Sequence, residues 1–454
     1  MKAATLTLCV ALFVPIGLKA AVEGETVTIA GKTYAVVPDE KMRAWGFDVP
    51  DLPRENNAAW VYFKAINAYS GLDRGSDLWR LRDAVEQGTW TKEAAPLDNY
   101  LKRNAKALAL LKKAAAMRDC YFPPIGNVGD TFEDVSPAGL LLPHLSHTRE
   151  LARFLIVTGK KLEFDGRPAE ALATYLLVPR LGYHASRGTM LIHGLVGLAF
   201  NRMAMEAIEE CLMRHACDEQ TLVRVQAQLA ELSTRRPDIA WAMHSEKVCS
   251  VQCAEHFLRH PELHGGRLTW RLYIRLCGLT RKEWHAIVRR DVEEFWDITD
   301  RHVRMPLREY LHSDAQEELS RKVRARSDRG PANIMILLGP AIWSSRIIYA
   351  RDDLYWAVLD VEIALARFKA RHGKYPGTLD ELKLLMLSDG IDPFSGEPLK
   401  YRLEKDGSFT IWSVGEDLKD NGGKLKEVAA RWDPLPREAL NRADYVWNSR
   451  RLLE

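Results

Sequence analysis

The chain has 454 residues, of which 47% are hydrophobic and 28% are charged, and its formal net charge is +3. This balance is ordinary for a folded protein with a large core, and the length predicts roughly two to four domains. Because the charge is nearly balanced, there is no domain-wide basic excess, which argues against a nucleic-acid-binding protein.

The N-terminal segment 1–21 has the pattern of a secretory signal peptide. Lys2 precedes an apolar run over residues 3–18, and small residues end the segment at Ala20 and Ala21. Cleavage after either alanine would release an exported protein into the periplasm or cell envelope. The alternative is an uncleaved anchor, because about 17 apolar residues can just span a bilayer. No other segment predicts a membrane span.

Six cysteines follow this segment: Cys120, Cys211, Cys217, Cys249, Cys253 and Cys277. An even number in an oxidising compartment permits disulfides, but the sequence does not select a pairing. The alternative is that several are small buried residues with free thiols.

Residues 22–55 are predicted to form a short β-hairpin segment. Val27 and Ile29 alternate along one face before a turn at Gly31-Lys32, and Tyr34 continues the pattern on the second strand.

Residues 56–330 are predicted to form a helical body, arranged as hairpins in a bundle or an α-solenoid. Asp218 is the expected N-cap of one helix, and Thr280 and Glu283 have the capping-box spacing before another. Apolar stripes and these caps predict helices at residues 56–69, 91–117, 145–162, 168–178, 190–215 and 218–232, then one with Pro237 in its first turn that ends near residue 261, and one after Thr280.

Residues 165–172, followed by Tyr175, resemble the second half of a tetratricopeptide repeat. The small residues Gly166 and Ala171 are expected to let two helices approach closely. No second copy follows at a period of about 34 residues, so the sequence predicts helical hairpins and not a repeat array.

An apolar segment at residues 332–343, interrupted by Gly339-Pro340, is expected to be a buried connection. It leads into a long helix at residues 345–371, where Leu354 and Val358 begin one continuous apolar stripe.

Several short motifs follow this helix in a fixed order. They are Gly373-Lys374-Tyr375-Pro376, a short helix at 379–385, Asp392-Pro393-Phe394, Ser413-Val414-Gly415-Glu416-Asp417 and Gly422-Gly423. In this order they resemble the head of the type II secretion major pseudopilin. The resemblance implies that residues 345–435 form a long helix with a small antiparallel α+β domain, before a C-terminal tail at 436–454.

One departure from that family concerns assembly. A pseudopilin begins with a short leader, a processing site and a hydrophobic assembly helix, whereas here the pilin-like helix lies deep in the chain. The protein is therefore not expected to polymerise as a pilin does. The helical body also resembles uncharacterised exported bacterial proteins that carry the same tail, and that resemblance implies no activity.

The pseudopilin resemblance implies a calcium ion in the loop around the glycine pair. The corresponding oxygen donors are Asp417, Asp420, Asn421 and Asp433. Calcium takes six to eight hard oxygen ligands, so these residues supply part of a site that would brace the loop. The alternative is an ordinary surface turn built from Asx residues and glycines.

A stripe of Cys249, Cys253, His256 and His260 is the best candidate for a metal site in the body. Zinc favours these ligands, but on a helix the stripe spans about 16 Å, which is too long for one tetrahedral ion. A helix face that packs against a neighbour is the simpler interpretation.

The sequence lacks a Gly-x-Ser-x-Gly elbow, a phosphate loop and a dinucleotide-binding glycine motif. We therefore expect a non-enzymatic envelope scaffold that binds an unidentified protein partner. The alternatives are a metal-dependent or hydrolytic enzyme with its site in the helical body, and an accessory component of a type II secretion-like system.

Overall fold

A computed structural model of the chain describes residues 25–71, 95–128, 137–236, 238–260, 278–314, 317–318, 321, 334–423 and 444–448. Within them the protein is mainly helical with two small antiparallel sheets, as predicted. The predicted signal segment 1–21 and Asp433 lie outside the described residues. Within the described part, no helix is long and apolar enough to cross a membrane.

The predicted N-terminal hairpin is confirmed. Strand β1 (Thr26–Ile29) pairs antiparallel with β2 (Lys32–Val36), and the turn contains Gly31 at a φ of 79°. A third short strand, β3 (Ile125–Gly126), joins the other edge of β2. The sheet therefore links the start of the chain to a segment that lies about ninety residues later.

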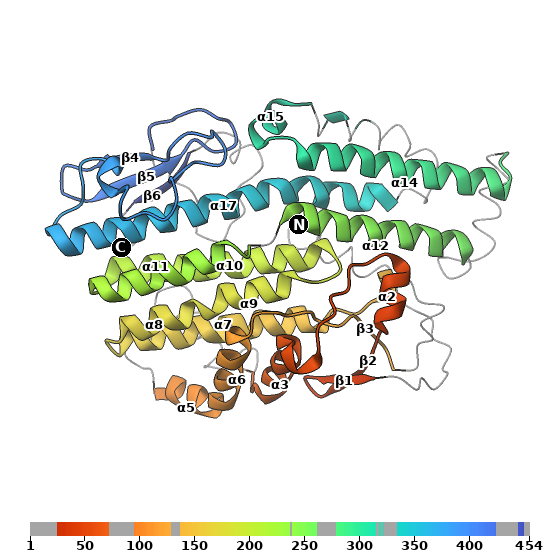
Figure 1. Cartoon of the computed structure of the whole chain (residues 1–454), viewed down its shortest axis with the longest axis horizontal. Coiled ribbons are helices and arrows are strands. Elements are labelled where there is room, and N and C mark those ends of the chain that lie inside the picture. Colours follow the sequence, from red (N-terminus) through yellow and green to blue (C-terminus); the bar gives the residue numbers. More distant parts are fainter. Residues whose placement is uncertain are drawn as a thin grey trace.

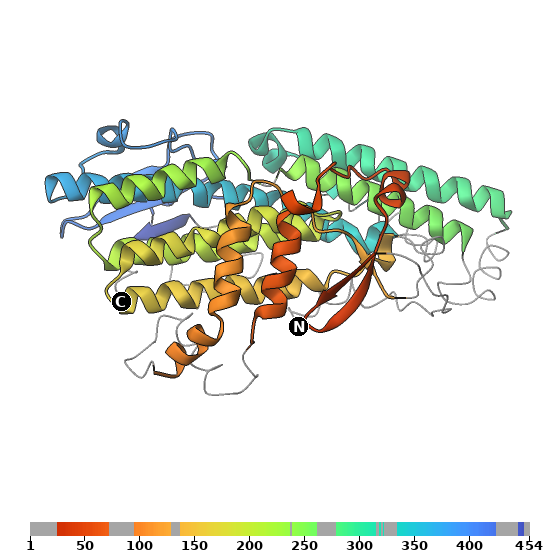
Figure 2. The same ribbon diagram turned by 60° about the horizontal axis from the view of Figure 1, so that its bottom comes forward.

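The helices of the body are α2 (Asp39–Trp45), α3 (Ala58–Ala68), α5 (Ala95–Arg103), α6 (Ala105–Ala116), α7 (Pro143–Phe164), α8 (Pro168–Tyr175), α9 (Leu177–Ser186), α10 (Leu191–Arg214), α11 (Glu219–Ser233), α12 (Ile239–Arg259), α14 (Arg281–Arg304) and α15 (Leu307–His312), with 3-10 turns η1 (Arg54–Asn56) and η2 (Pro137–Gly139). Figure 1 shows α7 to α11 stacked along the molecule. Helices α3 and α6 lie across this stack with the N-terminal sheet beside them (Figure 2).

Helix starts agree with the predicted capping residues. The Asp218 carboxylate accepts a hydrogen bond from the Thr221 backbone N–H at 2.7 Å, and Thr280 with Glu283 completes a reciprocal capping box. Helix α12 begins at Ile239, after Asp238 as its N-cap. Pro237, which was predicted to sit in the first turn of this helix, lies outside the described residues.

Two predicted helices are divided in the structure. The helix expected over 91–117 breaks at Asn104, whose buried side-chain amide accepts from Ser70 N at 2.7 Å and donates to Ser70 O at 3.1 Å. The helix expected over 168–178 ends at Tyr175, because Pro179 in the first turn of α9 has no N–H to continue the ladder. Both breaks depend on chemistry that apolar periodicity does not record.

Glycines set the closest helix contacts, though not where the sequence predicted. A Cβ on Gly197 of α10 would lie 2.6 Å from the Gly182 carbonyl oxygen of α9, so these helices meet at their backbones. The Gly159 Cα on α7 faces the Tyr175 ring in the same way. Gly166 has no neighbouring atom within 4 Å of such a position, and its φ is +74°, so it forms a left-handed turn and does not provide the expected close approach.

Helix α17 (Ile334–His372) is the longest element and runs along most of the molecule (Figure 1). At 39 residues it is about 58 Å long. The expected connection at 332–343 and the expected start at 345 are wrong, because the helix continues through Gly339 and Pro340. Helices α12 and α14 both contact α17, and tertiary packing commonly outweighs local helix preference.

The C-terminal sheet lies against the second half of α17. Strands β4 (Lys400–Leu403) and β5 (Phe409–Ser413) form the predicted hairpin, and η5 (Leu379–Leu382) is the predicted short helix as a 3-10 turn. Gly373 ends α17 at a φ of +73°, as expected. Strand β6 (Tyr445–Asn448) pairs with β5, so part of the segment predicted as a C-terminal tail at 436–454 belongs to this domain.

Candidate functional site

The loop that carries the predicted calcium ligands is built from Asx turns. The Asp417 carboxylate accepts from Lys419 N at 3.1 Å. The Asp420 carboxylate accepts from Trp412 Nε1 at 2.9 Å and from Gly422 N at 2.8 Å, and these donors hold the pKa of Asp420 below its usual range. The backbone at the glycine pair is left-handed, which explains the two glycines.

Asp444, which directly precedes β6, completes this loop and was not identified from the sequence. Its carboxylate accepts from Asn421 N at 3.1 Å, Asn421 Nδ2 at 3.2 Å and Gly423 N at 2.9 Å. In the described part of the chain, no group of three or more His, Cys, Asp or Glu residues is placed to hold a metal ion. Because Asp433 lies outside the described residues, calcium binding stays a prediction.

The Cys/His stripe lies along α12. The Cys249 and Cys253 sulfurs are 4.0 Å apart without a disulfide, and the His256 and His260 ring centroids are 4.9 Å apart. The hydrogen bond with Cys253 and burial both raise the pKa of Cys249, which favours the neutral thiol. All five cysteines that the structure describes are free, whereas Cys277 falls outside it.

A buried ion cluster lies beneath the tetratricopeptide-like turn. Lys160 Nζ is 3.1 Å from Glu163 Oε1 and 2.8 Å from Glu210 Oε2. The Tyr175 hydroxyl donates to Glu163, and His215 Nε2 is 3.2 Å from its other oxygen. The cluster joins α7, α8 and α10, and each carboxylate has a cationic neighbour that offsets the cost of its burial.

The interior of the body also contains a histidine core, which we define as His144, His184 and His193. The His144 ring stacks on Phe122 with centroids 4.8 Å apart, and it also stacks on the His193 ring with centroids 5.5 Å apart. The Tyr62 hydroxyl lies 2.9 Å from His184 Nδ1. Burial lowers the pKa of His184 to about 3 and that of His193 to about 4, so these rings are neutral.

The contact between α10 and α17 contains buried acids, which we call the acid seam: Asp352 and Glu362. Asn201 Nδ2 donates to the Asp352 carboxylate at 3.2 Å, and burial raises the pKa of Asp352 to about 7. Burial, and then the negative charge of Glu209, raise the pKa of Glu362 well above its usual range. Burial therefore favours the protonated, neutral form of both acids in the seam.

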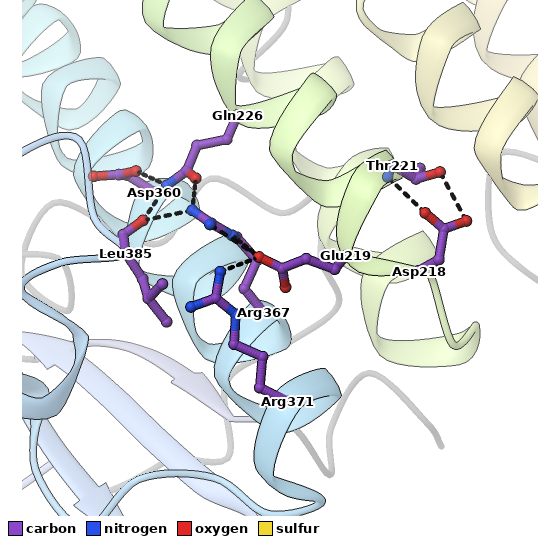
Figure 3. A network of polar contacts seen from close by, with 8 residues as sticks. All are labelled: Asp218, Glu219, Thr221, Gln226, Asp360, Arg367, Arg371 and Leu385. Carbon is purple, nitrogen blue, oxygen red and sulfur yellow. Dashed lines mark hydrogen bonds and ion pairs between the residues drawn. The ribbon is translucent and has the colours of Figure 1, made fainter.

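A polar network fixes the segment that follows η5, residues 383–390, which we call the braced loop. The Asp360 carboxylate on α17 accepts from Leu387 N at 3.0 Å, Ser388 N at 2.8 Å and Ser388 Oγ at 2.7 Å. It also accepts from Gln226 Nε2 at 2.9 Å, and the same amide donates to Leu385 O at 2.7 Å (Figure 3).

Two arginines extend the network across α11 and α17 (Figure 3). Arg367 Nη1 donates to Gln226 Oε1 at 2.6 Å, and its Nε donates to Glu219 at 3.0 Å. Arg371 reaches the same Glu219 oxygen at 2.5 Å. Burial would raise the pKa of Glu219, but the hydrogen bonds from Arg371 and Arg367 outweigh it and hold that pKa below its usual range. The body and the C-terminal domain are thus joined by side chains from both.

The braced loop presents large apolar side chains to solvent. Leu384 is 97% exposed and Leu387 is 58% exposed, whereas Leu382 and Leu385 are buried and anchor the segment. Ile391, just beyond the loop, is 39% exposed. Exposed apolar residues that gather on a fixed backbone are typical of an interaction surface.

No family model, curated protein or solved structure matches the chain. The pseudopilin resemblance of residues 345–435 therefore stays a prediction from the order of its motifs.

The braced loop was missed from the sequence because residues 379–385 were interpreted only as a short helix. The run Leu384-Leu385-Met386-Leu387 was the available signal, since four large apolar residues in a row cannot all face the core of a short turn. Its anchor Asp360 lies 27 residues earlier on another element, and nothing in the local pattern connects the two.

Proposed function

We propose that the protein is an exported, non-enzymatic scaffold of the cell envelope that binds a partner protein through the braced loop. The observation that carries this proposal is the exposure of Leu384 and Leu387 on a backbone that Asp360 holds in place. Burying these side chains against a partner removes apolar surface from water. Because the loop is already ordered, little conformational entropy is lost on binding.

Helix α17 gives this surface its scaffold role. Its first half packs among α10, α12 and α14, and its second half carries η5 and the C-terminal sheet. A partner at the braced loop is therefore held in a fixed position relative to the whole body. A calcium ion at Asp417, Asp420, Asn421 and Asp433 would brace the neighbouring glycine loop and take no part in chemistry.

Site-specific photo-crosslinking tests the partner proposal. A photo-reactive phenylalanine at position 384 should give one discrete crosslinked product in the cell envelope of the producing organism. The same group at position 290, an exposed site on α14, should not give that product. Equal products from both positions, or none from either, would contradict the proposal.

The captured partner must then bind in a purified system. Leu384→Asp and Leu387→Asp should each weaken its affinity at least about tenfold, since each places a charge in an apolar contact. Their melting temperatures should match that of the parent chain because both side chains face solvent. If the partner is a secretion-system protein, the accessory role in type II secretion follows from the same surface.

Calcium binding is tested on the exported full-length chain by calorimetric titration. The parent should bind the ion and an Asp417→Asn, Asp420→Asn double variant should not. A parent that releases no heat and shows no rise in melting temperature with calcium has no such site.

A further inference from the structure

A cavity of about 310 Å³ opens on the body between α2, the first half of α12 and the end of α14. Met243 and Val251 of α12, with Val303 of α14, give it apolar walls. Trp45 adds an aromatic side at the last position of α2. At about 30 Å³ per molecule, this is room for roughly ten waters, so the cavity has the size of a small organic ligand.

Trp45 is held in place by its surroundings. The residue after it, Gly46, adopts a φ of 94° and ends α2, which fixes the direction of the chain at this point. Lys41 lies over the indole, with Nζ 5.3 Å from the ring centroid. The indole is therefore a preformed wall of the cavity, and binding would require little reordering of it.

The charges around the cavity are predominantly positive. Lys247 Nζ and Asp300 Oδ2 form an ion pair 2.7 Å long across α12 and α14, and this pair satisfies both groups. His244 and Arg304 also line the cavity, and neither side chain has a hydrogen-bond or ion-pair partner among the described residues. Both residues are exposed.

A further guanidinium lies behind the α14 wall. Arg346 of α17 donates to the carbonyl oxygens of Val303 and Met305, which end α14. The positive charge of Arg346 offsets the partial negative charge at the C-terminal end of α14, where Arg304 is the last residue.

We propose that this cavity binds an organic anion with an aromatic or apolar body. His244 and Arg304 would hold the anionic group through charge-assisted hydrogen bonds. The body of the ligand would lie against Trp45 and the apolar side chains of α12. This site goes beyond the scaffold role, because it lies beside α12 and α14, whereas the braced loop belongs to the domain at the other half of α17 (Figure 1).

The probe for this site is 8-anilinonaphthalene-1-sulfonate, an aromatic anion whose fluorescence rises on binding. The natively folded parent should show saturable binding at one site. Arg304→Gln and the double variant with His244→Gln should weaken the affinity about tenfold or more, because they remove the groups that face the sulfonate. Trp45→Leu should weaken it through loss of the aromatic wall.

Two comparisons isolate the site. Uncharged N-phenyl-1-naphthylamine should bind the parent and Arg304→Gln with equal affinity, because it lacks the sulfonate group that Arg304 would contact. Arg290→Gln, an exposed arginine elsewhere on α14, and Leu384→Asp should leave sulfonate binding unchanged. The second variant also separates this site from the braced loop, so either proposal can fail alone.

Absence of saturable binding by the folded parent would overturn the proposal. So would an affinity that is the same in the parent, Arg304→Gln and Trp45→Leu. Near-ultraviolet circular dichroism of each variant establishes that the fluorescence reports the native cavity and not a loosened core.

Discussion

The histidine core and the acid seam are both buried, yet burial acts on their protonation in opposite directions. Burial favours the neutral form of any ionisable group, which means a lost proton for His193 and a retained proton for Asp352. The two regions share α10, since His193 and Asn201 are two turns apart on that helix. One helix therefore joins a region that acid weakens to a region that alkali weakens.

The stability of the protein should therefore fall both at low pH, through the histidine core, and at high pH, through the acid seam. The folded-state pKa of His193 is depressed to about 4, so its contribution is present above about pH 6.5 and is lost as the pH falls. The folded-state pKa of Asp352 is raised to about 7, so its contribution is present below about pH 4 and is lost as the pH rises to 7. Between about pH 4 and pH 6.5, a fall in pH weakens the contribution of His193 and strengthens that of Asp352.

Phe122→Ala should destabilise the histidine core and cause the largest loss of unfolding free energy. The ring stacks on His144 and on Tyr62, so its removal leaves a cavity and costs about 3–5 kcal/mol of unfolding free energy at pH 7.5. Water admitted to the histidine core should also weaken the acid dependence. Urea titrations at several pH values measure both effects.

Phe122→Leu is the control for that experiment. It keeps most of the volume and should cost under about 1.5 kcal/mol. If the alanine and leucine variants lose equal stability, the ring does not support the histidine core as described.

His193→Gln should reduce the loss of stability that the protein suffers at acidic pH. In the parent, His193 binds a proton below about pH 6.5 in the unfolded chain but only below about pH 4 in the folded chain. The variant should therefore lose about 2–3 kcal/mol less than the parent between pH 7 and pH 4.5. His312→Gln, at an exposed site, should retain the parental dependence, and a parental slope in His193→Gln would count against the neutral buried ring.

Asp352→Asn should act on the alkaline side. The variant cannot ionise, so the shift of the Asp352 pKa from its usual value near 4 to about 7 predicts a gain of about 4 kcal/mol over the parent at pH 8.5 and equal stability near pH 4. Asp360→Asn should instead destabilise the protein at pH 8.5, because that carboxylate receives hydrogen bonds from the braced loop. Thermal unfolding at the two pH values distinguishes these outcomes, and a pH-independent gain for Asp352→Asn would exclude a titrating carboxyl.

Local signals in the sequence predicted the features that local chemistry determines. Asp218 and Thr280 cap helices where their spacing indicated, and Gly373 ends α17 in the left-handed conformation. The β4–β5 hairpin formed around Gly407 for the same reason. These features depend on residues within one turn of each other.

Features that depend on distant partners were not predictable in this way. Asn104 breaks a helix because it meets Ser70, and the braced loop is fixed because Asp360 lies opposite it. Asp444 joins the glycine loop from 21 residues away, across the predicted boundary of the domain. The sequence located the glycine loop of the candidate site, whereas its closing carboxylate and the exposed leucines needed the fold.

Helix α17 is made late, and this affects when the protein can fold. Synthesis must reach residue 372 of 454 before the helix is complete. Until residues 352 and 360 have been made, Asn201 lacks Asp352 and Gln226 lacks Asp360. The largest core takes only Trp356, Leu359 and Ile363 from α17 among its buried residues, so this helix joins the C-terminal half to a core that is built mainly from residues 27–232.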